Sequence, residues 1–245
     1  MSGLILPVPD SRAAGLALLM ALMPVEAQGL PGTAQCRLPN RIPTPRVENP
    51  INERDVRRMA IGGYTLALSW TPQYCASTAA RSMQCDKSIG RFGFILHGLW
   101  PDGKGRSWPQ WCSLASVLPR EVLAENLCVT PSVQLMQREW AKHGTCMAKK
   151  PDAYFDKARA LYLGLRFPDM ALMARQSRLT AGQLAGAFAR ANPGMRIDMI
   201  RVGSNRYGML SDLWICLDTA FNPTRCPAGR RGLSLNSRIR VRTGY

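Results

Sequence analysis

Residues 138–146 read REWAKHGTC, and the six residues before them, SVQLMQ, continue a helical pattern. On a helix through this segment, Glu139, Lys142 and His143 stand at positions i, i+3 and i+4, which share one face. An acid, an amine and an imidazole are therefore expected side by side. Gly144 is a typical residue just past a helix end, so the predicted helix stops there.

The chain contains two histidines, and the other one, His97, follows the apolar run Phe92–Leu96. This run predicts a short buried strand that ends at His97. Imidazole has a reference pKa near about 6.5, so one histidine can be held neutral as a general base while the other is held protonated as a general acid. Two histidines therefore suffice for acid–base chemistry.

Two segments resemble the signature motifs of one enzyme family. His97–Pro101 and Glu139–Cys146 are similar to the two signature segments of the ribonuclease T2 family, the metal-independent secreted endoribonucleases, and they lie about forty residues apart in the family's order. Three further segments resemble the bacterial periplasmic members: Tyr64–Trp70, Pro151–Phe155 and 243–245. The resemblance covers about residues 62–245.

The resemblance implies a mechanism. In RNA cleavage the 2′-hydroxyl loses a proton as it attacks phosphorus, and the departing 5′-oxygen gains one. By resemblance, His143 is the general base and His97 the general acid, and the two exchange roles if a 2′,3′-cyclic phosphate is later hydrolysed. Glu139 and Lys142 correspond to residues that stabilise the phosphorane-like transition state. Single-stranded RNA is the expected substrate, and DNA, which lacks the 2′-hydroxyl, should resist cleavage.

Substrate-binding candidates lie close to both motifs. Trp100 can stack on a base or fix the position of a catalytic histidine, and core packing is its alternative role. Asp102 and Trp108 stand where some family members have an acidic and an aromatic residue in contact with the base. Many members have a third histidine where this chain has Arg138, which can still bind a phosphate. Because of this departure, the family's pH optimum and second base site do not carry over directly to this chain.

The net charge of +16 predicts a polyanionic partner and binding that weakens as salt rises. Maintenance of solubility is the alternative explanation of the charge. A basic RNA-binding or toxin-like protein that keeps the fold without turnover is a rival functional hypothesis, and a metal-dependent phosphodiesterase is another. The presence of all four catalytic candidates favours the enzyme.

The first residues differ in character from the rest. Arg12 precedes an apolar run at 13–23, and small residues lead to a plausible cleavage site after Ala27, so we expect residues 1–27 to be a signal peptide and the protein to be periplasmic or secreted. A buried N-terminal helix is the alternative. Residues 28–60 are expected to form a Pro/Arg-rich arm, and 61–245 a ribonuclease T2-like catalytic domain. No apolar run reaches the length of about eighteen residues that a membrane span needs.

Eight cysteines indicate an oxidising compartment, although they allow about a hundred pairings. Two pairs are close enough in sequence to staple a loop or hairpin: Cys75 with Cys85, and Cys216 with Cys226. The resemblance implies a bond between Cys112 and Cys146, which leaves Cys36 and Cys128. Zinc is a competing use, but the sequence has no Cys-x-x-Cys spacing, so we expect neither a metal nor another cofactor.

Hydrophobic patterning predicts strands at both ends of the domain and helices between them. The expected strands are 64–70, 92–97, 195–202, 208–217 and 238–242. The expected helices are 132–143, 151–165 and 180–192, with a further short one at 52–59 and a loop beside a cleft at 101–111. This order predicts a single α+β domain with a largely antiparallel central sheet, disulfide-stapled and monomeric. The ribonuclease T2 resemblance implies the same architecture.

Overall fold

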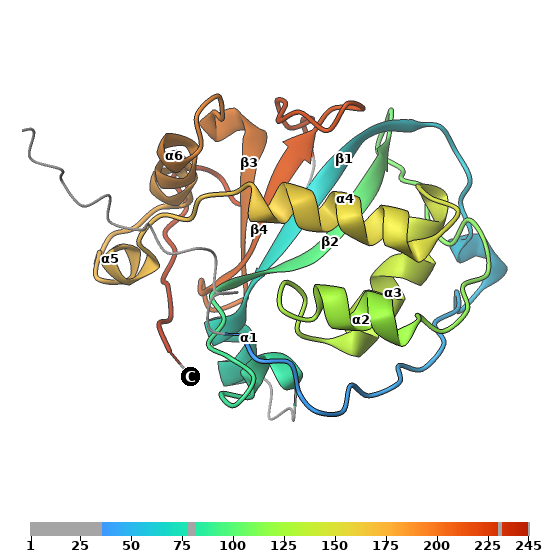
Figure 1. Cartoon of the computed structure of the whole chain (residues 1–245). Helices are drawn as coiled ribbons and strands as arrows, with labels where there is room; N and C mark the ends of the chain where they lie inside the picture. The colour runs from blue at the N-terminus through green and yellow to red at the C-terminus, as the bar shows by residue number, and fades with distance from the viewer. Residues whose placement is uncertain (1–35, 78–81, 230–231, 245) are drawn as a thin grey trace, which may run out of the picture.

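A four-stranded antiparallel sheet forms the centre of the computed structural model, which describes residues 36–77, 82–229 and 232–244 (Figure 1). Its strands are β1 (Ile61–Trp70), β2 (Phe94–Gly103), β3 (Ile200–Ser204) and β4 (Leu210–Leu217). Their order is β2-β1-β4-β3, and each neighbouring pair is antiparallel. The predicted α+β fold with an antiparallel sheet is confirmed. The predicted signal peptide lies outside the described residues.

The helices of the described part are α1 (Thr71–Ser77), α2 (Arg120–Asn126), α3 (Val133–Lys142), α4 (Pro151–Leu163), α5 (Met170–Ala174) and α6 (Ala181–Ala191). Figure 1 shows α4 crossing the sheet, with α2 and α3 beside it and α6 next to β3. Local sequence explains where they begin: Ser132 caps α3, and Pro151 occupies the first turn of α4. None of these helices is long and apolar enough to cross a membrane.

The main core lies between the sheet and the helices. Leu66 and Leu68 of β1 are fully buried in it. Two buried tyrosines of α4 also fix β2, because the hydroxyl of Tyr162 donates to the carbonyl of Phe94 at 2.7 Å and that of Tyr154 accepts from the backbone N–H of Leu99 at 3.2 Å. Burial raises the pKa of both tyrosines, so they remain neutral hydrogen-bonding groups.

A β-bulge interrupts the pairing of β1 and β2 at His97. Ala67 pairs with Gly98 and Leu68 pairs with Leu96, which leaves His97 without a partner in β1. A bulge redirects the side chain of its extra residue. On the outer side of β2, Leu96 donates its N–H to the carbonyl of Val129 at 2.9 Å, so the strand is held from both sides next to the bulge.

Four disulfides tie the described chain together: Cys36–Cys128, Cys75–Cys85, Cys112–Cys146 and Cys216–Cys226. These are the predicted pairs, and the prediction is confirmed. The first anchors the N-terminal arm beside β2. The third joins the turn after α3 to the segment that precedes α2, where Trp111 also donates its N–H to the carbonyl of Lys142 at 2.8 Å.

Several predicted boundaries were wrong. Strand β2 does not end at His97 but continues to Gly103, so part of the predicted 101–111 loop is strand. Segment 238–242 forms isolated bridges and no strand, because its backbone bonds first to Leu179 and then to Gly208 and Leu210. Strand β3 starts only after a 3-10 turn at Ile197–Met199, and segment 52–59 contains only the 3-10 turn Glu53–Asp55.

Candidate active site

Glu139 of α3 lies at the junction of the two sequence motifs. It is 4% exposed, and its Oε2 accepts a hydrogen bond from the indole Nε1 of Trp100 at 2.6 Å. Its other oxygen, Oε1, is 3.6 Å from Nε2 of His97. The packing of α3 beside the edge strand β2 therefore brings the acid of one motif against the imidazole and the indole of the other.

Gly98 makes this approach possible. A Cβ at position 98 would overlap the carboxylate of Glu139 and also lie 3.0 Å from the indole nitrogen of Trp100. The buried carboxylate is already held by Trp100 and has little room to move. Only glycine leaves space for it, which explains the glycine after His97 in physical terms.

The indole of Trp100 contacts both imidazoles. Its centroid is 5.4 Å from that of His97 in an edge-on arrangement, and 5.6 Å from that of His143 at an interplanar angle of 30°. The sequence left stacking, positioning and core packing open for Trp100. Its bond to Glu139 and its contacts with both histidines indicate that it positions the other groups of the site.

His143 is 5% exposed and forms the C-cap of α3. Burial lowers the pKa of His143 well below its usual value, and the neighbouring positive charge of Lys142 lowers it further. Its Nδ1 has no hydrogen-bond partner. A neutral imidazole at the end of a helix is able to accept a proton at neutral pH.

The acid and the amine on the same helix are both less strongly ionised than at a surface. Burial raises the pKa of Glu139, although the positive charges of His97 and Lys142 oppose this. Burial also lowers the pKa of the half-buried Lys142, against the effect of Glu139. Helix α3 holds both groups beside the histidines. An anionic phosphate bound there would meet a proton donor in Glu139 and a cation in Lys142.

The arm contributes charge to this site. Arg138 is exposed and pairs with Glu48 of the arm at 3.4 Å. Arg57 donates from Nε to the carbonyl of Trp108 at 2.9 Å and stacks over its ring at 4.6 Å. Its positive charge is among the causes that lower the pKa values of Lys142 and His143. The sequence analysis missed Arg57, although a cluster of three arginines at 54–58 was a visible signal.

Two other side chains change the sequence-based picture. Asp102 is buried and accepts a hydrogen bond from Thr65 at 2.7 Å, so its side chain links strands β1 and β2. Ser69, which the sequence analysis missed, places Oγ 2.8 Å from Nδ1 of His97. The only signal for Ser69 was its alternation with Leu68 and Trp70, which predicts that it faces away from the core.

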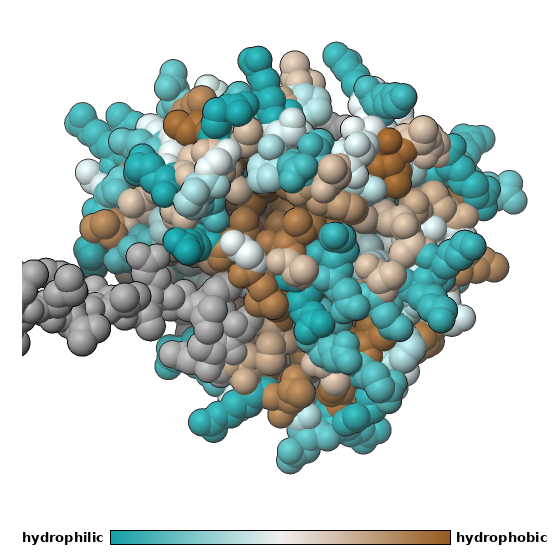
Figure 2. Space-filling view, turned by 45° about the horizontal axis from the view of Figure 1, so that its top comes forward, coloured by the Kyte–Doolittle hydropathy of each residue, from teal (hydrophilic) through white to brown (hydrophobic). Residues whose placement is uncertain are grey.

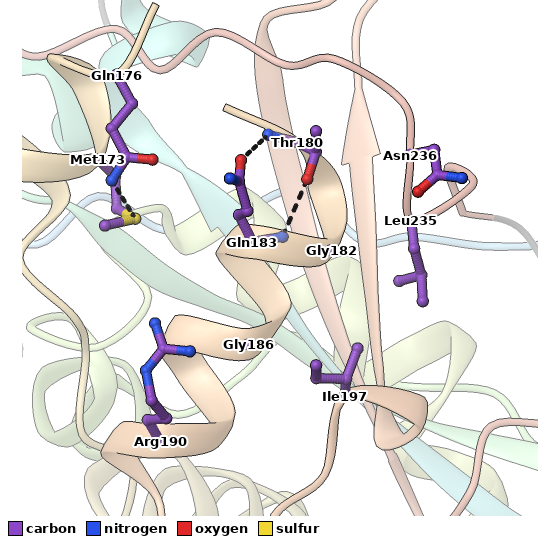
Figure 3. A pocket seen from close by; sticks show the side chains of 10 residues that line it. All are labelled: Met173, Gln176, Thr180, Gly182, Gln183, Gly186, Arg190, Ile197, Leu235 and Asn236. Atoms are coloured by element: carbon purple, nitrogen blue, oxygen red, sulfur yellow. Dashed lines mark hydrogen bonds between the residues drawn. The ribbon is translucent and has the colours of Figure 1, made fainter. Parts of the chain in front are cut away.

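Grooves elsewhere lack this chemistry. One of about 550 Å³ lies along α6, and its Thr180 and Gln183 are engaged in the helix cap (Figure 3). Another, of about 410 Å³, lies between α4 and β4 and is mainly apolar. Figure 2 shows hydrophobic side chains gathered near the middle of one face, with hydrophilic ones around them. No cluster of three or more potential metal ligands occurs among the described residues.

The chain matches the Ribonuclease T2 family over residues 61–226. It is 29% identical over 177 residues to a probable ribonuclease of Haemophilus influenzae, an alignment that covers 66% of this chain and 60% of that protein. It is 32% identical over 160 residues to a ribonuclease of Aeromonas hydrophila, with 63% of this chain and 71% of that protein covered.

Solved structures show the same fold. Trichomaglin, described as an S-like ribonuclease, superposes with a TM-score of 0.60 at 22% identity, covering 75% of this chain and 98% of its own. An RNase-related protein from Calystegia sepium gives a TM-score of 0.59 at 21% identity, covering 73% of this chain and 96% of its own.

Proposed function

Because the chain belongs to the ribonuclease T2 family, we propose that it is an endoribonuclease that cleaves single-stranded RNA by transphosphorylation through a 2′,3′-cyclic phosphate. One observation carries this proposal: the two motifs converge, so that His97, Trp100, Glu139 and His143 form one contiguous group. A phosphodiester bound there would meet two imidazoles, a carboxyl and the amine of Lys142.

His143 is the general base of the proposed reaction. A base must be unprotonated before it removes the proton of the 2′-hydroxyl. Burial and the charge of Lys142 lower the pKa of His143, which supports this role. As the 2′-oxygen bonds to phosphorus, the proton moves to the imidazole.

His97 is the general acid. Its side chain is 32% exposed, and Nε2 lies on the side of Glu139. The N–H bond at Nε2 breaks as the P–O bond to the 5′-oxygen breaks, and the leaving oxygen keeps the proton. In the second step a water molecule replaces the leaving group, and the histidines exchange roles.

Glu139 and Lys142 stabilise the transition state. Negative charge grows on the non-bridging oxygens during attack, and a cation or a proton donor aimed at them lowers the barrier. Lys142 supplies a cation, while Glu139, whose pKa is raised by burial, supplies a hydrogen bond or a proton. Trp100 positions the groups around the phosphate. Arg138 binds the substrate through its exposed guanidinium.

The wider setting follows from the same proposal. Four disulfides in the described chain favour an oxidising compartment, so we place the protein in the periplasm or outside the cell. It acts as a monomer, needs no metal, and leaves DNA intact because DNA has no 2′-hydroxyl.

The test is incubation of the oxidised protein with a defined single-stranded RNA in excess EDTA, beside His97→Ala and His143→Ala. Mass analysis of the ends should find 2′,3′-cyclic phosphates with the wild type and none with either variant, at unchanged circular dichroism. DNA of the same sequence is the negative control. Substantial activity in either histidine variant would contradict the mechanism, and loss of wild-type activity in EDTA would favour the metal-dependent hypothesis.

A basic RNA-binding protein that keeps the fold without turnover is the second candidate, and the net charge of +16 favours it. It predicts salt-sensitive RNA binding by the wild type, no cleaved product, and the same affinity after His97→Ala.

A further inference from the structure

Ser69 connects His97 to a carboxylate on the far side of the central strand. Its Oγ lies 2.8 Å from Nδ1 of His97 and 3.0 Å from Oδ1 of Asp212. Ser69 belongs to β1 and pairs directly with Asp212 of β4, while His97 belongs to β2 on the other side. The three side chains therefore form a row across three strands, and the bulge at His97 turns the imidazole toward that row.

Counting protons fixes the direction of these hydrogen bonds. An ionised carboxylate only accepts, and a hydroxyl has one hydrogen to donate. Ser69 donates to Asp212, so its oxygen is left to accept from His97, and Nδ1 must carry the hydrogen. The neutral imidazole is then the Nδ1–H tautomer, and Nε2 is the nitrogen that gains and loses a proton.

We propose that Ser69 and Asp212 are positioning residues for the general acid. They hold Nδ1 protonated, so that Nε2 alone carries the exchangeable proton and faces Glu139 and the leaving oxygen. The inference rests on the proposed function for its catalytic meaning. When the Nε2–H bond breaks, its electron pair stays on Nε2, the 5′-oxygen takes the proton, and the bond from Nδ1 to Ser69 is unchanged. Nε2 is then the acceptor that the hydrolysis of the cyclic phosphate requires.

Charged groups approach His97 from both sides. Glu139 of α3 faces Nε2 at 3.6 Å, and Asp212 of β4 acts through Ser69 on Nδ1. His143 is close enough for the two imidazoles to interact electrostatically. His97 therefore lies between two carboxyl groups, one beside Nε2 and one that reaches Nδ1 through Ser69.

A purely structural role is the alternative. Thr65 and Asp102 form a comparable hydroxyl–carboxyl pair between β1 and β2 at 2.7 Å. The row at Ser69 differs because its hydroxyl also contacts an imidazole of the active site.

Two substrates distinguish a role in positioning the general acid from a purely structural role. One is a dinucleotide, whose 5′-oxygen must be protonated to leave, and the other is the matching nucleoside 3′-(4-nitrophenyl phosphate), whose phenolate leaves without a proton. General acid catalysis contributes on the order of 10²–10⁴-fold. We therefore expect Ser69→Ala and Asp212→Asn to lower kcat for the dinucleotide about tenfold or more and to change kcat for the phenyl ester less than about twofold. His97→Ala should give the same contrast with a larger loss.

Matched variants control the comparison. Ser69→Thr keeps the hydroxyl and should recover most of the dinucleotide activity. Asp156→Asn removes the same charge from the outer face of α4, where Asp156 pairs with Arg159 at 3.2 Å, and should leave both rates unchanged. Equal losses on both substrates, or no loss on either, would overturn the inference. An inactive wild type would instead refute the proposed function.

A second readout does not depend on activity. The chain has two histidines, so His143→Ala leaves one imidazole to observe. Nitrogen-15 NMR of this variant at alkaline pH should find the Nδ1–H tautomer, and addition of Asp212→Asn should shift the population toward Nε2–H. A predominant Nε2–H tautomer with Asp212 intact would contradict the proposed proton arrangement even in an active enzyme.

Discussion

At the scale of single residues, burial distinguishes the two imidazoles. His143 is almost completely buried, whereas the side chain of His97 is 32% exposed and bonded to Ser69. A buried imidazole loses hydration when it is charged, so its neutral form is favoured. The environment of His143 thus supports its proposed role as the base before any substrate binds.

The depressed pKa of His143 predicts the acid limb of the pH profile. Because kcat/KM reports the free enzyme, its acid midpoint should lie below 6.5, the usual value for histidine. Lys142→Gln removes a positive charge that lowers this pKa, so the midpoint should move to higher pH while the maximal rate falls. Initial rates on a dinucleotide across a pH series measure both effects. A wild-type midpoint above 6.5 would contradict the assigned base.

Gly98→Ala should impair catalysis with little effect on folding of the sheet. Its methyl group would overlap the carboxylate of Glu139, which must then leave Trp100 and move relative to His97. Loss of one preorganised electrostatic group costs about 10²–10³-fold in kcat, so we expect a decrease of at least about tenfold. Steady-state kinetics with circular dichroism and thermal unfolding test this.

Gly164→Ala is the matched control for that substitution. The nearest atom to a Cβ at position 164 is the carbonyl oxygen of Ala160 at 3.4 Å, and the site lies at the end of α4. Its kcat should equal that of the wild type. Full activity of Gly98→Ala would show that the carboxylate can move without consequence.

At the scale of elements, the arm lies against α3 and contacts Arg138, one of the proposed substrate-binding residues. Gln134 and Arg138 of α3 both contact Glu48, and Gln134 exchanges hydrogen bonds with the backbone of Arg46. The arm therefore lies along the same helix that carries Glu139 and His143. If Arg138 binds a phosphate as proposed, Glu48 competes with that phosphate for the guanidinium.

This competition predicts opposite effects of two substitutions. Arg138→Ala should raise KM for single-stranded RNA, and Glu48→Gln should lower it, both with kcat nearly unchanged. Arg138 is exposed and Glu48 is partly exposed, and pairs near the surface contribute about 0–1 kcal/mol, so each change should be at most about fivefold. Steady-state kinetics at low salt measure both values. A rise in KM for both variants would indicate that the pair matters only for docking of the arm.

Sequence patterns predicted most of the strands and longer helices but not the contacts between them. The predicted helices 132–143 and 180–192 end close to the observed ends of α3 and α6, because Ser132 and Thr180 cap them and Gly144 follows α3, and capping is local. The partners of His97 depend instead on the bulge in β2 and on β4 lying beside β1. Neither the bulge nor the strand order has a local signal, so Ser69 and Asp212 were not found.

The short helices were missed for a different reason. Helix α1 follows β1 directly and contains Pro72 in its first turn, and the sequence analysis expected no helix there. Helix α2 spans only seven residues, too few to give a clear periodicity. Tertiary packing stabilises such segments, and packing is not visible in a local pattern.

At the scale of the whole molecule, positive charge comes from several parts of the chain that meet near the site. The arm contributes Arg57, α3 contributes Arg138 and Lys142, and the net charge of the full sequence is +16. A long RNA would meet several cations in addition to those that face the cleaved phosphate.

The salt dependence of kcat/KM distinguishes positive charge that contacts RNA from positive charge that only maintains solubility. For single strands each neutralised phosphate contributes a slope of about −0.7 to log affinity against log salt concentration. A dinucleotide has one phosphate, so its kcat/KM should have a slope no steeper than about −0.7, whereas a long single strand that meets three or more cations should approach about −2. A DNA strand of the same length, used as a competitive inhibitor, should reproduce the steep slope without being cleaved. Equal slopes for the dinucleotide and the long RNA would mean that the excess charge does not contact the substrate, because each additional phosphate contact must release counterions.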